Sequence, residues 1–337
     1  MNTLRIVHCA HFSESKYGAV YYAIDRKLSN GLIRNGHFVY DFSYREIAKN
    51  STFFKSKKFG IKKLNTALLE TLSNIEPDLL LLGHSELISF ETLKEAKRLY
   101  PNMKIAMWWV DWIYNLHSIL ERLPLLDRFF ITSDPQLLKN HYSDPELLHK
   151  CVYLPNFCDT SIDSYKAFES STYLYDVLFI GRADKERAPF ISFLRDTFSH
   201  IKLGIFGQTK ESLITGVHYL KTIGSSKIGI NYNRNNALSL YSSDRIIHLL
   251  ANGTLVFSPK IPNFNTIFSE EEVIYFNDYE DCKEKITYYL TNDNQRKQIS
   301  QMGHAKAHRI FNEKRITQFL LESTYELPFT EVYEWVH

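Results

Sequence analysis

Residues 175–206, YDVLFIGRADKERAPFISFLRDTFSHIKLGIF, decide the fold class because apolar and amphipathic segments alternate there. The apolar runs 175–180 and 201–206 are typical of buried strands, and residues 188–198 between them have helical spacing. A strand, a helix and a second strand in this rhythm predict a parallel sheet that is covered on both faces.

The same alternation extends along the chain in both directions. We expect further strands at 4–10, 37–42, 79–82, 104–110, 128–132, 152–154, 227–232, 253–257 and 273–276. We expect further helices at 21–35, 90–99, 245–251, 278–291, 294–311 and 313–326. The sequence therefore predicts an α/β protein with two doubly wound, Rossmann-like sheets.

One segment interrupts this rhythm and marks a domain boundary. Residues 154–171, LPNFCDTSIDSYKAFESS, combine a proline with a cluster of Asn, Asp and Ser. The 337 residues suit about two domains. We expect domains at 1–155 and 172–315, followed by a C-terminal helix and tail, 316–337, that crosses back to the first domain. Two such domains predict a ligand cleft between them, with functional residues directly after the strands.

Composition limits the function classes. Lys and Arg number 40 and Asp and Glu number 38, so the net charge of +2 provides no general nucleic-acid coat. No apolar run reaches the roughly 18 residues that span a bilayer, and the first residues do not resemble a signal peptide. The four cysteines are scattered and are expected to be reduced and buried, as in a cytoplasmic protein. Peripheral contact with the inner face of a membrane stays open.

Common cofactor and metal motifs are absent from the sequence. It contains no Cys-x-x-Cys, no Walker sequence, no Gly-x-Gly-x-x-Gly, no His-Glu-x-x-His, no Gly-x-Ser-x-Gly and no Asp-x-Asp. We therefore expect no cofactor and no metal site.

The turn after strand 175–180 is the first candidate site. Gly181 and Arg182 are followed by Lys185 and Arg187. Glycine permits close backbone approach, and three cations within six positions can neutralise a diphosphate. The alternative is a solvated turn in which Asp184 and Glu186 partner these cations.

Two further candidates follow in the same half of the chain. Gly207 comes directly after strand 201–206, where a tight turn is the alternative. Residues 239–257, SLYSSDRIIHLLANGTLVF, place Ser243 and Arg245 at the start of a helix, and Asn252 and Gly253 at its end. A helix N-terminus with an arginine is a natural anion site, although an ordinary capped helix is the alternative.

This pattern resembles the C-terminal half of GT-B glycosyltransferases. It is similar to the group 1 C-terminal domain, and in particular to the spore-maturation-like branch, whose pattern is S-x-R-x-x-E-x-L-A-x-G. Residues 173–322 carry the resemblance, and the N-terminal half fits more loosely through Gly36-His37 and the run FSYRE. The positions that match the pattern are Ser243, Arg245, His248, Leu250, Ala251 and Gly253.

The resemblance implies a GT-B fold whose C-terminal domain binds a nucleotide-sugar. Arg182 and Lys185 would hold the donor diphosphate, and Arg245 would add to them. The implied donor site also includes Gly181, Gly207, Ser243, His248, Asn252 and Gly253. His248 stands where the family places a ribose-binding Glu, so a cytidine-monophosphate sugar is an alternative donor. The paired-Glu motif of the large retaining family is absent, because Leu240 occupies its first position.

The N-terminal domain would then supply the acceptor site and a general base. Asp111 follows strand 104–110 beside Trp108, Trp109 and Trp112, which would desolvate it and raise its pKa, although core tryptophans and a capping Asp111 are an equal alternative. The other candidate catalytic residues are His84 and Glu86 after strand 79–82. The loop after the first strand is expected near the acceptor or the donor phosphate through His11, Ser13, Lys16, Tyr17 and Gly18. Trp109 is a further candidate for the acceptor site, because an indole can stack on a sugar ring.

These expectations predict a metal-independent glycosyltransferase that moves a sugar from a nucleotide-sugar to a glycan or lipid-linked acceptor. Surface polysaccharide synthesis, or modification of proteins or glycans, would be its setting. A non-catalytic GT-B-like subunit that binds a glycan or partner is the alternative, and an epimerase or phosphorylase of this shape is a third. The aromatic tail (Tyr325, Phe329, Tyr333, Trp335) is expected to pack on the first domain, with a membrane surface as the alternative.

Overall fold

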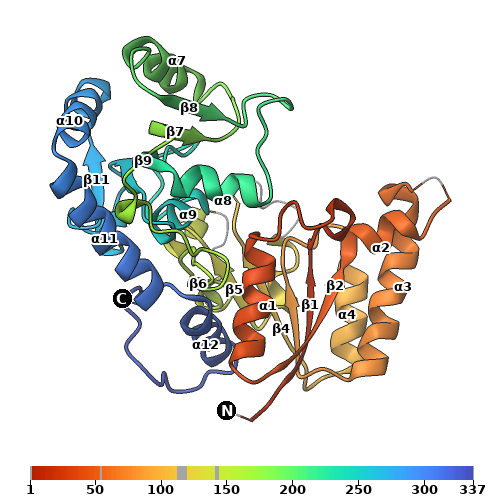
Figure 1. Ribbon diagram of the computed structural model, residues 1–337. Helices are drawn as coiled ribbons and strands as arrows, with labels where there is room; N and C mark the ends of the chain where they lie inside the picture. The colour runs from red at the N-terminus through yellow and green to blue at the C-terminus, as the bar shows by residue number, and fades with distance from the viewer. Residues whose placement is uncertain (1, 54, 112–119, 141–143, 337) are drawn as a thin grey trace. The chain divides into compact units, whose positions relative to one another are not determined.

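The computed structural model describes residues 2–53, 55–111, 120–140 and 144–336 (Figure 1). The described chain forms two compact units. Unit 1 comprises Met1–Pro155 and Glu313–Val336, and unit 2 comprises Asn156–Asn312. The division at Pro155 assigns the interrupting segment 156–171 to unit 2.

Unit 1 is built on a six-stranded sheet in the order β2-β1-β3-β4-β5-β6, and every pairing in it is parallel. Its strands are β1 (Arg5–Ala10), β2 (Phe38–Ser43), β3 (Leu79–Leu82), β4 (Lys104–Trp109), β5 (Arg128–Ile131) and β6 (Cys151–Tyr153). Its helices are α1 (Ile24–Arg34), α2 (Tyr44–Asn50), α3 (Lys57–Ile75), α4 (Phe90–Leu99), α6 (Pro145–His149) and α12 (Glu313–Thr324). The continuous apolar runs become central strands, as the fully buried LLLL of β3 shows.

Unit 2 is built on a five-stranded parallel sheet in the order β11-β10-β9-β7-β8. Its strands are β7 (Tyr175–Ile180), β8 (Leu203–Phe206), β9 (Ser226–Ile230), β10 (Leu255–Pro259) and β11 (Val273–Phe276). Its helices are α7 (Ala188–Thr197), α8 (Val217–Gly224), α9 (Arg245–Ala251), α10 (Tyr279–Thr291) and α11 (Asp293–Ile310). Helices α7 and α10 contribute to one apolar core on the sheet, while α9 contacts both α8 and α11.

Each sheet has one point at which the strand order reverses. In unit 1 the chain leaves β1 for β2 on one side and returns to β3 on the other. In unit 2 the same pattern places the reversal between β7 and β9. Loops diverge at such a point and leave a crevice outside the carboxyl ends of the strands, so these two positions are where polar side chains can meet a ligand.

The C-terminal helix belongs to unit 1, so the expected return of the chain to the first domain is confirmed. Arg128 of β5 donates to the Ser323 carbonyl oxygen at 2.6 Å, and Glu313 pairs with Arg34 of α1 at 2.6 Å. Tyr333 and Trp335 are buried against Phe319. The tail aromatics of the described chain therefore include core residues of unit 1.

The structure contains helices that the sequence analysis does not assign. Residues 43–78 hold α2 and the 19-residue α3, and α8 precedes β9. In α3 the buried Gly60, Leu64, Leu68 and Leu72 recur every four residues, but lysines interleave them and weaken the apolar stripe.

Two expectations about composition can be compared with the structure. All four cysteines are free and buried, as expected, and burial raises the pKa of Cys9 to about 12. Within the described part of the chain, no helix is both long enough and apolar enough to cross a membrane.

The contact between α1 and α12 yields a stability prediction. A Cβ added at Gly31 would lie 2.3 Å from the Glu313 carbonyl oxygen, so Gly31→Ala must push the two helices apart. We expect urea unfolding to show a loss of about 1–3 kcal/mol. Ile33→Ala on the exposed side of α1 is the control, with a change within about 0.5 kcal/mol. A gain in stability for Gly31→Ala, as alanine gives in an open helix, would contradict this packing.

Candidate functional site

Arg245 joins the ends of two strands at the reversal point of unit 2. Its Nη1 donates to the Ile180 carbonyl oxygen at the end of β7 at 2.9 Å, and its Nη2 donates to the Tyr232 carbonyl oxygen just after β9 at 2.8 Å. Nη2 also lies 3.2 Å from the Ser243 Oγ. The side chain is buried, and α9 begins at Arg245 as the sequence predicts. Its Nε has no hydrogen-bond partner among the described residues.

A second buried arginine lies beside Arg245. Arg187, at the start of α7, is held by Asp184 through its Nε at 2.9 Å and its backbone N–H at 3.0 Å. Arg234, from the loop after β9, donates to the same Asp184 carboxylate at 3.0 Å. Asp184 therefore fixes two guanidiniums next to the end of β7.

The side chains of Arg245 and Arg187 both pack against Gly181. A Cβ at this position would lie 2.8 Å from Arg245 Nη1 and 3.2 Å from Arg187 Nη1. Burial, and then the charge of Arg187, lowers the pKa of Arg245 to about 10. Two like charges held together in a buried place repel each other, so the site favours an anion that neutralises both.

The turn after β8 packs against Gly181. Gly207 has φ +82°, and a Cβ there would lie 3.2 Å from the Gly181 carbonyl oxygen. Gln208 donates its amide N–H to that same oxygen. The structure therefore brings Gly181, Gly207, Ser243 and Arg245 together around one turn.

Arg182 and Lys185 lie elsewhere on this turn. Both are exposed, and the Lys185 side chain, 92% exposed, lies 3.9 Å from Glu186. Of the three cations in this turn, Arg187 is the one that is buried beside Arg245. Their part in holding a diphosphate stays a prediction.

His248, Asn252 and Gly253 follow along α9, away from its start. His248 is buried, and its Nδ1 lies 2.9 Å from the Tyr219 hydroxyl. Asn252 donates to the His248 carbonyl oxygen at 2.8 Å and accepts from the Tyr165 backbone N–H at 3.2 Å. Gly253, with φ +75°, closes the helix as expected. The described contacts of Asn252 fasten segment 163–168 to the end of α9, and its role toward a donor stays a prediction.

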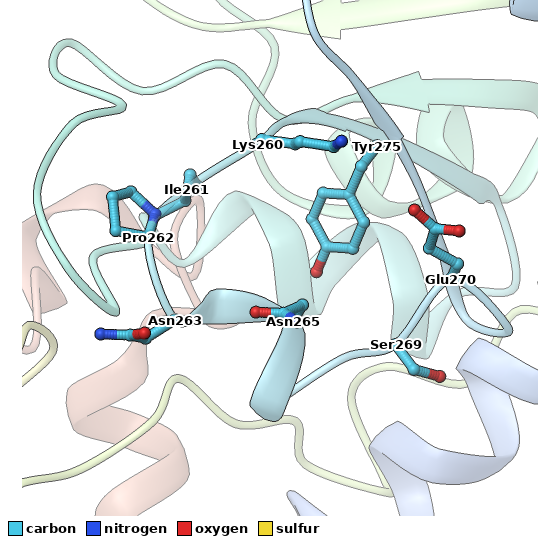
Figure 2. A pocket seen from close by; sticks show the side chains of 8 residues that line it. All are labelled: Lys260, Ile261, Pro262, Asn263, Asn265, Ser269, Glu270 and Tyr275. Carbon is cyan, nitrogen blue, oxygen red and sulfur yellow. The ribbon is translucent and has the colours of Figure 1, made fainter.

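A cavity of about 530 Å³ opens beyond β10 in unit 2 (Figure 2). It is lined by Lys260, Ile261, Pro262, Asn263, Asn265, Ser269, Glu270 and Tyr275. Its wall is tied to the loop before α9, since Leu240 N–H donates to the Pro262 carbonyl oxygen at 3.0 Å and Asn263 donates to the Ser239 Oγ at 3.0 Å. The mixed lining suits a polar molecule with one apolar face.

Unit 1 has its own polar cluster at the β1/β3 reversal point. Asp25 lies in the first turn of α1, where its carboxylate accepts from the His11 backbone N–H at 3.3 Å. A Cβ on Gly83, the residue after β3, would lie 3.1 Å from Asp25 Oδ1. Burial raises the pKa of Asp25 to about 6. His8 lies 4.0 Å from Asp25, and burial lowers its pKa to about 4, so the imidazole is neutral near pH 7.

Glu86 is held by two residues of α2. Tyr44 donates its hydroxyl to Glu86, and Arg45 pairs with the carboxylate at 2.6 Å. Burial alone would raise the pKa of Glu86, but the Tyr44 hydrogen bond and the Arg45 charge hold it below its ordinary value. The buried Arg122 fixes the loop from below by donating to the Ser85 and Ile88 carbonyl oxygens at 2.9 and 2.6 Å.

The structure changes the expected setting of Asp111. Its side chain is exposed, so the expected desolvation by neighbouring tryptophans is wrong. Trp108 and Trp109 are buried core residues because β4 is a central strand, and Trp112 lies outside the described residues. Trp109 instead stacks on His84, with ring centroids 4.3 Å apart, and burial lowers the pKa of that histidine.

The loop after β1 is partly fixed and partly exposed. The Ser13 Oγ lies 3.1 Å from His11 Nε2. Lys16 is exposed, and Tyr17 has its side chain 97% exposed. Tyr17 and Gly18 both have positive φ, and in the glycine this costs no steric strain. Only the His11 end of the loop therefore joins the group of His8, Asp25 and Gly83, the Asp25 cluster.

Sequence reasoning overlooked several members of both clusters. The sequence analysis counts Arg187 among the cations that can neutralise a diphosphate, but it gives Asp184 only as a partner in a solvated turn and Tyr44 and Arg45 only within FSYRE. Asp25 could have been found from its place near the start of a helix that follows a strand-end loop. Arg122 and Arg234 carried no local signal, since their roles depend on distant carbonyl oxygens and carboxylates.

Comparison with known proteins gives a family match over part of the chain and several solved structures of similar fold. Residues 185–322 match the model of a family described as glycosyl transferase-like. No curated protein matches the chain. An alpha-glucosyltransferase solved with UDP-glucose and DNA containing an abasic site is similar over 96% of this chain and 100% of its own, with a TM-score of 0.67 and 14% identity.

The chain has the GT-B glycosyltransferase fold. Sucrose-phosphate synthase from Thermosynechococcus elongatus shares this GT-B fold with a TM-score of 0.61 and 12% identity, over 96% of this chain and 98% of its own. The Anabaena protein HepE, solved with UDP-glucose, does so with a TM-score of 0.57 and 10% identity, over 96% and 100%. The expected GT-B architecture is confirmed, with residues 185–322 as its glycosyl transferase-like part.

The raised pKa of Asp25 predicts a pH-dependent stability difference. A carboxyl whose pKa rises from 3.8 to about 6 on folding contributes stability below pH 4, and this is lost as pH rises through 6. The Asp25→Asn variant has no ionisable group at this position, so it does not lose this stability as the pH rises. We expect the variant to gain up to about 3 kcal/mol over the wild type at pH 8 relative to their difference at pH 4, measured by urea unfolding. A difference between the two proteins that is constant with pH would contradict a raised pKa of the partly buried Asp25 carboxyl.

Proposed function

We propose that the chain is a glycosyltransferase that binds a nucleoside diphosphate sugar in unit 2 and transfers the sugar to an acceptor hydroxyl. The observation that carries this proposal is the pair of buried guanidiniums, Arg187 and Arg245, held on Gly181 at the β7/β9 reversal point. The family match over residues 185–322 supports it.

A diphosphate suits the charge and donor arrangement of this site. Three guanidiniums, from Arg187, Arg234 and Arg245, outnumber the nearby carboxylates Asp184 and Asp244. Arginine presents several N–H donors in a fixed plane that matches phosphate oxygens. As the bond from the anomeric carbon to the phosphate oxygen breaks, the guanidiniums stabilise the charge that develops on the leaving diphosphate. We therefore propose a reaction that needs no metal.

Asp25 is the base that the geometry of unit 1 favours. With a pKa of about 6 it is mostly ionised at pH 7, yet remains a stronger proton acceptor than an ordinary carboxylate. In the proposed reaction it takes the proton of the acceptor hydroxyl, whose oxygen then bonds to the anomeric carbon. Glu86 is a weaker acceptor because Tyr44 and Arg45 hold its pKa low. His84 and Asp111 remain alternatives that mutation can compare.

UDP-sugars are the donor class that the similar structures favour over cytidine-monophosphate sugars, because two of those proteins were solved with UDP-glucose. We propose a glycan or lipid-linked acceptor, and the spore-maturation-like branch, the polysaccharide setting and a cytoplasmic location stay proposals. The buried His248, in place of a ribose-binding Glu, motivates the alternative of a non-catalytic binding subunit.

Nucleotide binding tests the diphosphate site. We expect isothermal titration to show binding of at least one nucleoside diphosphate or its sugar, with Arg187→Gln weakening it at least about tenfold because one charge-assisted contact is lost. Arg195→Gln, an exposed arginine on α7, is the matched control and should bind normally. Arg245→Ala should abolish transfer, but it also deprives two carbonyl oxygens of donors, so its fold must be checked by circular dichroism.

Two outcomes would change the assignment. Absence of binding across nucleoside diphosphates and their sugars would overturn the proposed function. Binding without any transfer or donor hydrolysis would favour the non-catalytic alternative.

Turnover separates the base from the donor site. We expect Asp25→Asn to lower kcat about 10²–10⁴-fold while the donor Kd stays unchanged, because the amide cannot accept a proton. The wild-type kcat should rise with pH through about 6 as the carboxylate ionises. An unaltered kcat in Asp25→Asn, with loss in His84→Gln or Asp111→Asn instead, would reassign the base.

A further inference from the structure

A surface that combines lysines with phenylalanines covers the start of α3 in unit 1. We call it the Lys-Phe surface and define it by Phe53, Lys55, Lys57, Lys58, Phe59, Lys62 and Lys63, all of which are exposed. The protein's net charge is only +2, so this is a local concentration of positive charge.

The lysines of the Lys-Phe surface are not compensated by acidic neighbours in the sequence. Residues 47–69 contain no Asp or Glu and no Arg. Among the described residues, no carboxylate forms an ion pair with these five lysines. Lys63 instead donates to the Ser51 carbonyl oxygen at 3.1 Å, which ties the loop to α3. The surface therefore presents a nearly uniform positive field.

The phenylalanines make this surface amphipathic. Phe53 is 95% exposed and Phe59 is 73% exposed, although both are large apolar side chains. Exposed apolar rings among lysines match a membrane interface, where ammonium groups meet anionic headgroups and the rings enter the acyl boundary. A single-stranded nucleic acid could also stack on rings, but such sites commonly use arginine as well, and residues 47–69 contain none.

The Lys-Phe surface lies beside α2, the helix that holds Glu86, because α2 and α3 pack together. Helix α2, which carries Tyr44 and Arg45, leads directly into this surface. After burial and the Arg45 charge, the charge of Lys57 is among the causes that lower the pKa of His11. The Lys-Phe surface and the residues that hold Glu86 thus lie on neighbouring helices.

We propose that the Lys-Phe surface docks unit 1 on an anionic membrane. Lipid binding itself does not depend on the proposed transferase activity. Its consequence, that the acceptor is lipid-linked rather than a free glycan, rests on the proposed function.

Cosedimentation of the full chain with vesicles tests the docking. We expect binding to vesicles of phosphatidylcholine with about a third phosphatidylglycerol, little binding to phosphatidylcholine alone, and loss of binding as salt rises, since screening shortens electrostatic reach. The triple variant Lys57→Gln, Lys58→Gln, Lys62→Gln should bind anionic vesicles at least about tenfold more weakly. The control variant Lys94→Gln, Lys221→Gln, Lys283→Gln removes the same charge from exposed lysines elsewhere and should bind normally.

A second pair of variants tests the apolar part. Phe53→Ser with Phe59→Ser should weaken vesicle binding even at high salt, whereas Leu174→Ser with Val332→Ser, two other exposed apolar residues, should not. Equal binding by the lysine variant and its control would overturn the proposal, as would stronger binding to single-stranded DNA or RNA than to anionic vesicles. Vesicle binding without nucleotide binding would support membrane docking by the Lys-Phe surface and overturn the proposed transferase function.

Discussion

The buried guanidinium of Arg245 is the constraint on which the candidate donor site depends. It bridges the carbonyl oxygens at the ends of β7 and β9 and so holds the reversal point of the sheet together. Burying a cation without a close carboxylate partner is costly, and placing the Arg187 cation beside it adds repulsion. Two adjacent buried guanidiniums add little to the stability of the fold on their own. Their arrangement is explained if an anionic ligand supplies the missing negative charge.

Glycine at position 181 makes this arrangement possible. Any side chain there would occupy the space of the two Nη1 atoms, and the backbone of Gly207 approaches the same turn from β8. Unit 1 uses the corresponding position differently. At its β1/β3 reversal point, Gly83 makes room for the Asp25 carboxylate instead of a guanidinium. The same topology thus presents cations in one unit and a proton acceptor in the other, which are the two kinds of group that sugar transfer requires.

Much of the fold could be predicted from the sequence because buried parallel strands are nearly continuous apolar runs. Strands 79–82, 175–180 and 273–276 and helices 90–99 and 245–251 have the predicted bounds. Helix α3 was not predicted, because its lysines interrupt the apolar periodicity. The same lysines belong to the Lys-Phe surface.

The candidate site was less predictable, because burial decides which charged side chains lie in the site and local sequence does not show burial. Arg182, Lys185 and Arg187 are equivalent cations in the sequence, but only Arg187 lies at the start of α7, where Asp184 turns it inward. Asp25 has no special neighbours in sequence, since its raised pKa comes from burial at the point where β1, α1 and Gly83 meet.

We propose that Arg187 and Arg245 together bind the diphosphate of a nucleotide-sugar. A crystal structure of the full chain with a bound nucleoside diphosphate tests it most directly. We expect both phosphates next to Gly181, within hydrogen-bond distance of Arg187 and Arg245. Phosphates bound only in the Lys260 cavity, only at the exposed Lys185, or in unit 1 would contradict it.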